Sequence, residues 1–411
     1  MKQRPLDGIR VADLTMMWAG PYATKLLAEM GAEVIKVESP KAWDNIRTLL
    51  VQPGVADPWN SAFYFNEYNR EKKSLILDLA DQRGHDAFLK VVAQCDVVIE
   101  NYRADVLDKL GLGYEVLRGV RPDVILVSMA AFGKTGADQD LVGFGPVIEL
   151  MSGLCSLTGY ADEDEPFKTG ISYGDPVGGT YAAGAVALAL ATRERSGKGA
   201  YIDLAQREGA ALLAGEAFVA ASLHGEAQPR HFGNRSARWA PQGAYRCAGD
   251  DQWVVLSVVT DEEWRACCAV LGRDDLAGLG LAERQARHDE LDAVITDWTR
   301  DQDPQDVMED LQDAGVPAGR CLDAGDIHED PQLVRRHFWV YLPNPKMHRY
   351  KQAGIAWRLI ECNPSLARHA PMFGEHTREI LTKVGGLTDG DVDDLYAAGV
   401  CADEPVNPGV G

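Results

Sequence analysis

The fold prediction for the first part of the chain rests on residues 9–38, IRVADLTMMWAGPYATKLLAEMGAEVIKVE. Its opening apolar run at 9–14 is typical of a short strand, and residues 33–38 have the same character. Between them, residues 21–30 carry apolar side chains at helical spacing and end at Gly31, a common stop for a helix. The stretch therefore predicts a strand, a helix and a second strand, the βαβ arrangement of parallel sheets.

Similar apolar runs follow at 74–77, 97–100 and 124–129, and helical stretches such as 81–94 lie between them. Strands that alternate with helices favour a parallel sheet over an antiparallel one. We therefore predict an α/β fold for this part of the chain. In such folds, ligands bind beyond the carboxyl ends of the strands.

The character of the sequence changes near residue 222. Apolar helical runs near 177–192 and 209–222 give way to QPRHFGNRSARWAPQG at 228–243, a loop rich in Arg, Gly and Pro. Residues up to about 335 then carry a strand and amphipathic helices of their own. We expect a second, smaller domain in this region.

Composition excludes several classes of function. The 62 acidic and 41 basic residues give a net charge of -21, which argues against nonspecific binding of nucleic acid or anionic membrane. The eight cysteines form no CxxC pair, and the nine histidines form no HxxxH or HExxH pattern, so we expect neither a metal site nor a disulfide framework.

The sequence also predicts a cytoplasmic protein that is not embedded in a membrane. The N-terminal MKQRPLDGIRVADL lacks the apolar segment of a signal peptide. The most apolar run, at 177–192, is shorter than the roughly 20 residues that span a bilayer, and it carries small residues throughout. It is better interpreted as a buried, closely packed helix.

Two motifs invite a nucleotide-binding interpretation. Glu38 ends the second predicted strand, where the ribose-binding acid of an NAD enzyme would lie, but the turn TMMWAGP lacks the GxGxxG pattern. A nicotinamide-dependent dehydrogenase is thus a weaker alternative, and a solvated carboxylate at a strand end is the simpler role for Glu38. The segment SGKGAY at 196–201 lacks the first glycine of a phosphate loop, so we interpret it as a turn.

Basic residues follow the ends of predicted strands, in NREKKS at 69–74 and at Arg103 and Lys109. In an acidic chain, such cations could bind phosphate groups. The alternative is that they are ordinary surface charges. Asn101 is more suggestive of a binding site, because it directly follows an apolar strand.

Asp175 lies between a glycine and a proline in FKTGISYGDPVGGTYAAG, residues 167–184. An Asp followed by Pro is typical of a helix start, so we expect Asp175 to be an N-cap and Pro176 to begin the helix. A carboxylate at a helix N-terminus is kept ionised, which suits a nucleophile. Glycines around it, at 174, 178 and 179, would leave space for a bulky substrate.

Taken in order along the chain, several segments resemble the family III CoA-transferases, which include formyl-CoA transferase and carnitine CoA-transferase and are related to the 2-methylacyl-CoA racemases. The resemblance runs from about residue 6 to 395. The segments that carry it are LDGIRVADLTMMWAGPYATKLLAEMGAEVIKVESP, NREKKSLILDL, VVIENYRADVLDKLGL, GLCSLTG, GDPVGG, RERSGKGAYIDLAQ and GEHTREIL.

The resemblance implies that Asp175 is the aspartate that attacks an acyl-CoA thioester and forms a covalent intermediate. It implies a CoA thioester and a small carboxylic acid as substrates, with no permanently bound cofactor. It also implies that CoA contacts Trp18, Ala19, Leu77, Ala80, Asn101, Tyr102, Arg103 and Lys109.

The same resemblance implies an architecture. A Rossmann-like large domain is built from both ends of the chain, here 1–222 and 336–411, and a smaller α+β domain is inserted between them, here 223–335. Two such subunits interlock as a homodimer.

The chain departs from the family pattern at several positions. Trp18 replaces a glutamine of formyl-CoA transferase and Ser39 replaces a frequent arginine, which weighs against formyl or oxalyl substrates. Phe144 replaces the histidine of the racemases, and because phenylalanine cannot carry a proton, racemisation is disfavoured. Glu149 either helps to position a substrate or is an amphipathic-helix carboxylate. We expect the loop at 234–243 to cover the substrate, and a noncatalytic CoA-binding regulator remains a further alternative.

Overall fold

The computed structural model describes residues 4–160, 165–225, 233–362 and 366–406. The chain forms two compact units. The large unit comprises residues 1–155, 168–223 and 337–411, and the small unit comprises 156–167 and 224–336. The division expected from the sequence instead places 156–167 in the large domain.

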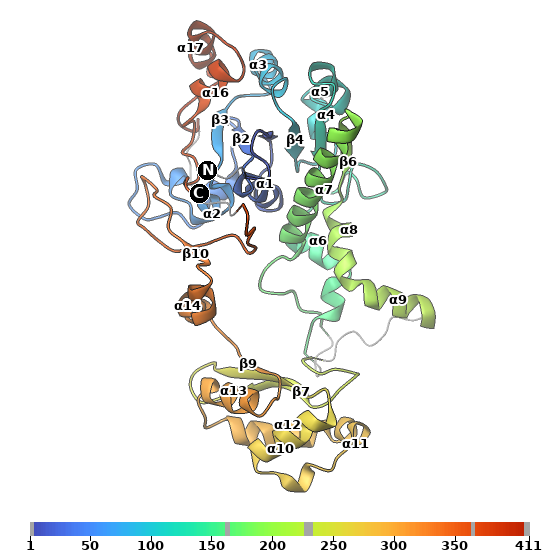
Figure 1. The fold of residues 1–411 in the computed structure, drawn as a ribbon. Helices are drawn as coiled ribbons and strands as arrows, with labels where there is room; N and C mark the ends of the chain where they lie inside the picture. Colours follow the sequence, from blue (N-terminus) through green and yellow to red (C-terminus); the bar gives the residue numbers. More distant parts are fainter. Residues whose placement is uncertain (1–3, 161–164, 226–232, 363–365, 407–411) are drawn as a thin grey trace. The chain divides into compact units, whose positions relative to one another are not determined.

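The large unit is built on six parallel strands in the order β3-β2-β1-β4-β5-β6 (Figure 1). This arrangement confirms the predicted α/β fold and its parallel sheet, and the strand order is that of Rossmann-like folds. The strands are β1 (Arg10–Asp13), β2 (Glu33–Glu38), β3 (Lys73–Ile76), β4 (Val97–Glu100), β5 (Ile125–Ser128) and β6 (Ala200–Asp203).

Helices cover both faces of this sheet. The bounds in the large unit are α1 (Ala19–Glu29), α2 (Phe63–Asn69), α3 (Gln82–Val92), α4 (Val106–Lys109), α5 (Tyr114–Val120), α6 (Gly145–Met151), α7 (Gly174–Ser196), α8 (Gln206–Ala211), α9 (Gly215–His224), α16 (Thr377–Lys383) and α17 (Asp389–Ala397). A short hairpin, β10 (Trp339–Val340) and β11 (Gln352–Ala353), precedes the last two helices.

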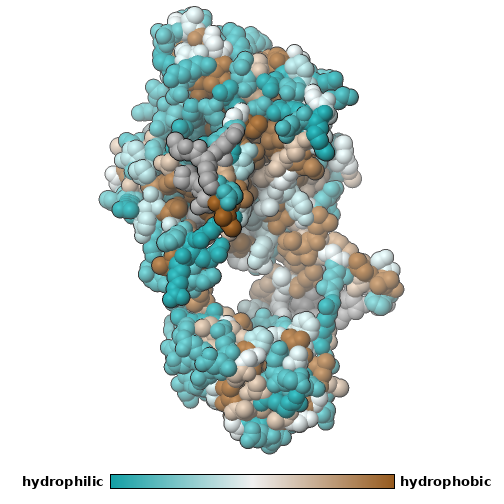
Figure 2. All heavy atoms as spheres, viewed as in Figure 1, coloured by the Kyte–Doolittle hydropathy of each residue, from teal (hydrophilic) through white to brown (hydrophobic). Residues whose placement is uncertain are grey.

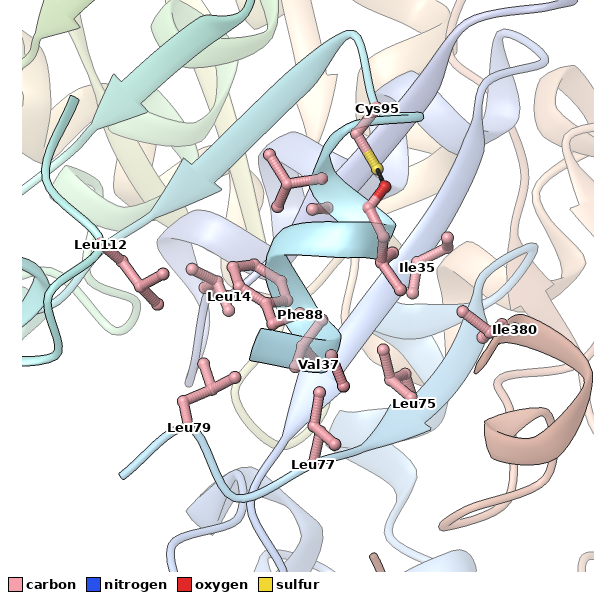
Figure 3. Packing of buried hydrophobic residues seen from close by; sticks show 14 of the residues in the cluster. Leu14, Ile35, Val37, Leu75, Leu77, Leu79, Phe88, Cys95, Leu112 and Ile380 are labelled. Atoms are coloured by element: carbon pink, nitrogen blue, oxygen red, sulfur yellow. Dashed lines mark hydrogen bonds between the residues drawn. The ribbon is translucent and has the colours of Figure 1, made fainter. Parts of the chain in front are cut away.

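Alternate residues of each strand enter the two cores, as the strand periodicity requires. On one face, Leu14, Ile35 and Leu75 pack against Phe88 of α3 and Ile380 of α16 (Figure 3). On the other face, the apolar side chains of β1, β4 and β5 pack against α1 and α7. The central strands are buried on both faces, which is why their sequences are continuously apolar.

The end of the chain completes the edge of the sheet. The backbone N–H of His376 donates to the carbonyl of Ser74 at 3.2 Å, and the N–H of Ile76 donates to Thr377 Oγ1 at 3.0 Å. The outer edge of β3 is thereby covered by the start of α16.

Two helical predictions differ from the structure in their bounds. The predicted helix at 177–192 begins earlier, at Gly174, and continues to Ser196. The predicted helix at 209–222 is divided, because α8 ends at Ala211 and a short 3-10 turn precedes α9. Within the segment 196–201, which was predicted to be a turn, residues 197–199 connect α7 to β6.

The small unit has a three-stranded antiparallel sheet covered by helices. Its core is centred on Trp264, Leu291 and Leu311. Its elements are β7 (Gln242–Arg246), β8 (Trp253–Ser257), α10 (Asp261–Leu271), α11 (Leu281–Ala286), α12 (His288–Thr299), α13 (Pro304–Asp313), β9 (Ala318–Arg320), α14 (Ala324–Glu329) and α15 (Pro331–Arg335).

Among the residues that the structure describes, no helix is both long and apolar enough to cross a membrane. Each of the eight cysteines is a free thiol. Within 4–160, 165–225, 233–362 and 366–406, no group of three or more His, Cys, Asp or Glu side chains is arranged to hold a metal ion.

Candidate active site

Asp175 lines a cavity of about 320 Å³ in the large unit, beyond the carboxyl ends of β1, β4 and β5. Five of the eight CoA-contact residues implied by the resemblance line the same cavity. These are Trp18, Ala19, Asn101, Tyr102 and Arg103. The remaining lining comes from Met16, Met17, Asn45, Ala130, Ala131, Leu141, Val142, Gly143, Phe144, Ile148 and Gln206.

Asp175 is the second residue of α7, and the predicted N-cap role is wrong. Tyr173 is the N-cap residue, and its side chain makes no capping hydrogen bond. The helix starts one residue before the aspartate because Gly174 already has helical geometry. The Asp175 carboxylate thus does not cap its own helix, and the backbone N–H of Ala19, at the start of α1, lies near enough to lower its pKa.

Burial of the Asp175 carboxylate raises its pKa to about 6. The Ala19 N–H lowers this pKa, the negative charge of Glu149 raises it, and the positive charge of Lys168 lowers it. We expected the helix N-terminus to keep the carboxylate well ionised, but loss of hydration outweighs that effect. The raised pKa makes the carboxylate a stronger base, and therefore a better nucleophile, than an ordinary aspartate.

The rate of a reaction that needs ionised Asp175 should fall in mild acid. Below a pH of about 6, most of the carboxylate is protonated and lacks the charge needed for attack, so kcat/KM should rise with pH, reach half of its plateau at about pH 6 and level off about one pH unit higher. A pH profile of kcat/KM from 4.5 to 8 checks this. The Glu149→Gln variant removes a negative charge near Asp175, so its acid limb should lie at lower pH than that of the native enzyme. An acid limb near pH 4 in the native enzyme would contradict the raised pKa of Asp175.

The glycines near Asp175 serve helix packing, which corrects their predicted role of clearing space for substrate. A Cβ at Gly179 would lie 2.6 Å from the carbonyl oxygen of Ala19 and 2.9 Å from the Tyr22 ring. A Cβ at Gly174 would lie 2.7 Å from Ile148. The absence of these side chains lets α7 approach α1 and α6 closely, and this approach brings Ala19 to the carboxylate.

Gly145, a residue that sequence reasoning missed, leaves room for the nucleophile itself. A Cβ at this position would lie 1.9 Å from Asp175 Oδ2 and 2.5 Å from the Cβ of Ser172. The carboxylate therefore occupies the space that any other residue would fill. The local sequence VGFGPV does not indicate this role of Gly145, because Gly145 and Asp175 come into contact only in the folded chain.

A second cavity, of about 230 Å³, lies beside the first. Leu77 and Ala80 line it, and Tyr102 and Met16 line both cavities. Its walls are mainly apolar, with Leu79 and Leu110 among them. Seven of the eight residues that the resemblance implies for CoA thus gather around two adjoining cavities.

The eighth residue, Lys109, lines neither cavity. It forms an ion pair with Asp105, and Arg103 binds the same carboxylate through Nε and Nη2 at 2.9 Å each. All three side chains are partly exposed at the end of the loop after β4. Any phosphate bound by these two cations would compete with Asp105.

Two of the three cations in the basic segment 69–74 are not at the surface, which corrects both interpretations for Arg70 and Lys72. Arg70 is buried and paired with Glu29 at 2.6 Å. Lys72 is buried and paired with Asp13 at 3.0 Å. These two charges are therefore internal to the fold, and neither is available to a phosphate in solution.

Glu38 is buried as well, so the prediction of a solvated carboxylate is wrong. Its side chain forms an ion pair with Arg47 at 2.8 Å, and both side chains are almost fully excluded from solvent. The Arg47 guanidinium also stacks on the Phe65 ring, with 3.4 Å between its Cζ and the ring centroid. A carboxylate occupied in this way is not free to bind a ribose.

The sequence analysis missed Gln206, a polar residue of this cavity, and Lys134, which lines another cavity. Gln206 is buried, lines the cavity with Asp175 and donates from Nε2 to the carbonyl of Met129 at 2.7 Å. Lys134 follows β5, and its ammonium group binds the carbonyl of Ala104. Their place after consecutive parallel strands is the signal that could have found them.

Glu149, on α6, is fully buried, so it is not the solvent-facing carboxylate of an amphipathic helix. Its Oε1 accepts hydrogen bonds from Thr169 Oγ1 at 2.8 Å and from the Thr169 N–H at 3.4 Å. Glu149 therefore anchors the segment that leads into α7, and its charge acts on Asp175 from that place.

The loop at 234–243 belongs to the small unit, where α11 and α12 hold it. Arg235 pairs with Asp292 at 2.5 Å, and Arg284 Nε donates to the carbonyl of Ala240 at 2.7 Å. The Gln242 N–H donates to His288 Nε2 at 3.2 Å. The role of this loop in covering substrate stays a prediction.

Comparison with known proteins places the chain in a family. The family model described as CoA-transferase family III matches residues 6–377. The chain is similar to succinyl-CoA–D-citramalate CoA-transferase of Chloroflexus aurantiacus, with 33% identity over 96% of this chain and 97% of the relative. It is also similar to succinyl-CoA:mesaconate CoA-transferase of Haloarcula hispanica, with 35% identity over 92% of this chain and 96% of the relative.

A solved structure agrees with this placement. The crystal structure of a CAIB/BAIF family protein from Brucella suis resembles the chain with a TM-score of 0.84 and 30% identity, over 93% of this chain and 100% of the other. The family resemblance noted in the sequence is thereby confirmed. This chain belongs to CoA-transferase family III.

Proposed function

We propose that this CoA-transferase uses Asp175 as a nucleophile to move CoA from an acyl-CoA thioester to a carboxylic acid. The observation that carries the proposal is the Asp175 carboxylate itself, which lines a cavity beside Ala19 and whose pKa burial raises to about 6. It is ionised at neutral pH but poorly hydrated, a combination that favours attack on a carbonyl carbon.

The reaction proceeds through two kinds of covalent intermediate. An Asp175 oxygen attacks the thioester carbon and expels CoA thiolate, which leaves a mixed anhydride. The thiolate then attacks the aspartyl carbon of the anhydride and expels the donor carboxylate, which leaves an aspartyl-CoA thioester. An acceptor carboxylate attacks that thioester and expels the thiolate, which attacks the acceptor carbonyl and restores Asp175. No water, proton or electron is consumed, and each difficult transfer becomes two easier ones.

CoA is held by the two adjoining cavities in this proposal. Its thioester end reaches Asp175 beside Trp18 and Ala19, and its nucleotide end lies toward Leu77 and Ala80. The shared residue Tyr102 lies between the two ends, which supports a single extended ligand. Arg103 lines the first cavity, and Lys109, which lines neither, would reach a CoA phosphate only by leaving its ion pair with Asp105.

Isotope exchange between a thioester and free acid tests this function. The enzyme is mixed with succinyl-CoA or acetyl-CoA and with labelled acids from a panel that includes the acids named for the relatives, namely citramalate, mesaconate, glutarate and oxalate. Label should enter the CoA thioester for at least one acid. CoA binding without exchange for any acid would instead identify a noncatalytic CoA-binding protein.

The racemase alternative is tested in deuterated water with a 2-methylacyl-CoA. Phe144 stands at the cavity where a proton-carrying histidine would be needed, so no deuterium should enter the α-carbon. Incorporation of deuterium at the rate of turnover would favour racemisation over CoA transfer.

We also propose that the enzyme is a cytoplasmic homodimer whose large domain, at 1–222 and 336–411, binds CoA. Large apolar side chains at the surface along α8 and α9 support a partner (Figure 2). They include Leu212, Leu213, Phe218, Val219 and Leu223. Sedimentation should give twice the mass of the 44.8 kDa chain, and a single-chain mass at micromolar concentration would refute the dimer.

A further inference from the structure

The loop between β1 and α1, residues 14–18, is held by buried side chains from several strands. The N–H of Thr15 donates to Asp13 Oδ1 at 2.9 Å, and the carbonyl of Thr15 accepts a hydrogen bond from Lys36 Nζ at 2.7 Å. Asp13 ends β1 and Lys36 lies in β2. Both backbone polar groups of Thr15 are thus hydrogen-bonded.

The next two residues of the loop are held in the same way. The N–H and the carbonyl of Met16 both bind the Asn101 side chain, at 2.8 Å each. The N–H of Met17 donates to Asp44 Oδ1 at 2.9 Å. Met17 has a φ of 67°, a left-handed conformation that is costly for a residue with a side chain. The hydrogen bond to Asp44 is one of the interactions that stabilise it.

The side chains that hold the loop are charged and buried. Lys36 pairs with Asp44 at 2.9 Å, and Lys72 pairs with Asp13 at 3.0 Å, with all four side chains fully excluded from solvent. Burial opposes ionisation of Asp13, yet the charges of Lys72 and Lys36 hold its pKa below the usual value. Buried ion pairs are weak stabilisers compared with apolar side chains of the same size. Their presence here calls for a role other than stability.

The loop leads directly to a residue that acts on Asp175. Met17 is followed by Trp18 and then by Ala19, which lines the same cavity as Asp175 and whose N–H lowers the pKa of that carboxylate. The start of α1 packs closely against α7 at Gly179. A shift of the loop would therefore also shift the groups around the Asp175 carboxylate. The position of the loop 14–18 therefore affects the geometry around Asp175.

Taking Asp175 as the nucleophile, as proposed above, we propose that Asp44 and Lys36 are positioning residues of the active site. They fix the loop 14–18 so that the Ala19 N–H orients the Asp175 carboxylate for attack. Neither residue lines the cavity that contains Asp175. They act through the loop and not on the substrate.

Two substitutions at one position isolate this role. Asp44→Ala removes the acceptor for the Met17 N–H, whereas Asp44→Asn removes the same charge but keeps an oxygen that can accept. We expect Asp44→Ala to lower kcat by about 10²-fold, because small misplacements of reacting groups have effects of this order. Asp44→Asn should stay within about fivefold of the native enzyme, since one neutral hydrogen bond contributes about 1 kcal/mol.

The pH profile provides a readout that a purely structural role would not move. The charged or titratable groups that act on Asp175 are Glu149, Lys168 and Tyr68, and both variants keep them. Both variants lose the Asp44 charge alike. A displaced Ala19 N–H would no longer lower the pKa of Asp175, so the acid limb of kcat/KM should move to higher pH in Asp44→Ala and not in Asp44→Asn.

A matched control separates positioning from general loosening. Glu29→Ala breaks the equally buried pair with Arg70 at the other end of α1, and it should reduce thermal stability while kcat and the acid limb stay native. If Asp44→Ala does not fold, the double variant Lys36→Met/Asp44→Met removes both charges at once and should fold. Native kcat in a folded Asp44→Ala or double variant would overturn the proposal, as would an equal loss in Glu29→Ala.

Failure of this inference can be told apart from failure of the proposed function. Asp175→Asn is measured in the same assay. If that variant keeps native turnover, Asp175 is not the nucleophile and the proposed function fails, whatever the Asp44 variants do. If it is inactive and Asp44→Ala is native, only the positioning role is rejected.

Discussion

Asp175→Asn is expected to lower the rate of CoA transfer by on the order of 10⁴-fold or more, because an amide oxygen cannot replace a carboxylate as nucleophile. The substitution changes little in size, and the Asn side chain keeps an oxygen that can face the Ala19 N–H. The fold and the binding of acyl-CoA should therefore persist, and the loss should fall on kcat.

Covalent trapping gives a direct measurement for this prediction. The native enzyme is mixed with an acyl-CoA and then with hydroxylamine or borohydride, and the modified peptide is identified by mass spectrometry. Asp175 should carry the modification in the native enzyme and not in the variant. Full turnover without modification of Asp175, or native turnover in Asp175→Asn, would show that another group is the nucleophile.

Gly145→Ala is expected to lower kcat by about 10²-fold without unfolding the protein. The added methyl group would lie 1.9 Å from Asp175 Oδ2, closer than two unbonded atoms can approach, so the carboxylate must move. The second close contact, 2.5 Å to the Cβ of Ser172, pushes on the segment just before α7. Both displacements turn the nucleophile away from the Ala19 N–H.

A glycine elsewhere in the same helix as Asp175 offers the matched control. Gly184 lies in α7, and a Cβ added there would meet no neighbouring atom within 4 Å. Gly184→Ala should therefore leave kcat native and add about 0.5 to 1 kcal/mol to the free energy of unfolding. Steady-state kinetics and thermal melts of the two variants provide the comparison. Native kcat in Gly145→Ala would mean that Asp175 is free to move without loss of function.

The elements of the large unit follow from local patterns in the sequence. The apolar runs at 9–14, 33–38 and 97–100 form strands because continuous apolar sequence suits strands buried on both faces. Residues directly after such strands, including Trp18, Asn101 and Tyr102, meet at one edge because parallel strands end on the same side of a sheet. This part of the candidate site needs no knowledge of distant contacts.

The environment of each charge could not be predicted in the same way. Glu38, Arg70 and Lys72 look like surface residues in the sequence, yet all three are buried, and Arg70 and Lys72 pair with residues 41 and 59 positions away along the chain. The ionisation of Asp175 differs from expectation for a related reason. The helix start is local and visible in the sequence, whereas the burial that outweighs it and raises the pKa comes from α1 and α6.

The covered edge of β3 bears on how the chain folds as it is synthesised. Ile76 and Thr377, which meet at this edge, are 301 residues apart in the sequence. A ribosome makes the whole six-stranded sheet well before it makes the segment that closes the sheet's outermost strand. During that interval β3 presents unpaired backbone groups to neighbouring nascent chains, a recognised route to aggregation. The net charge of the protein, -21, then opposes aggregation, since nascent chains that repel one another can complete synthesis and folding before they associate.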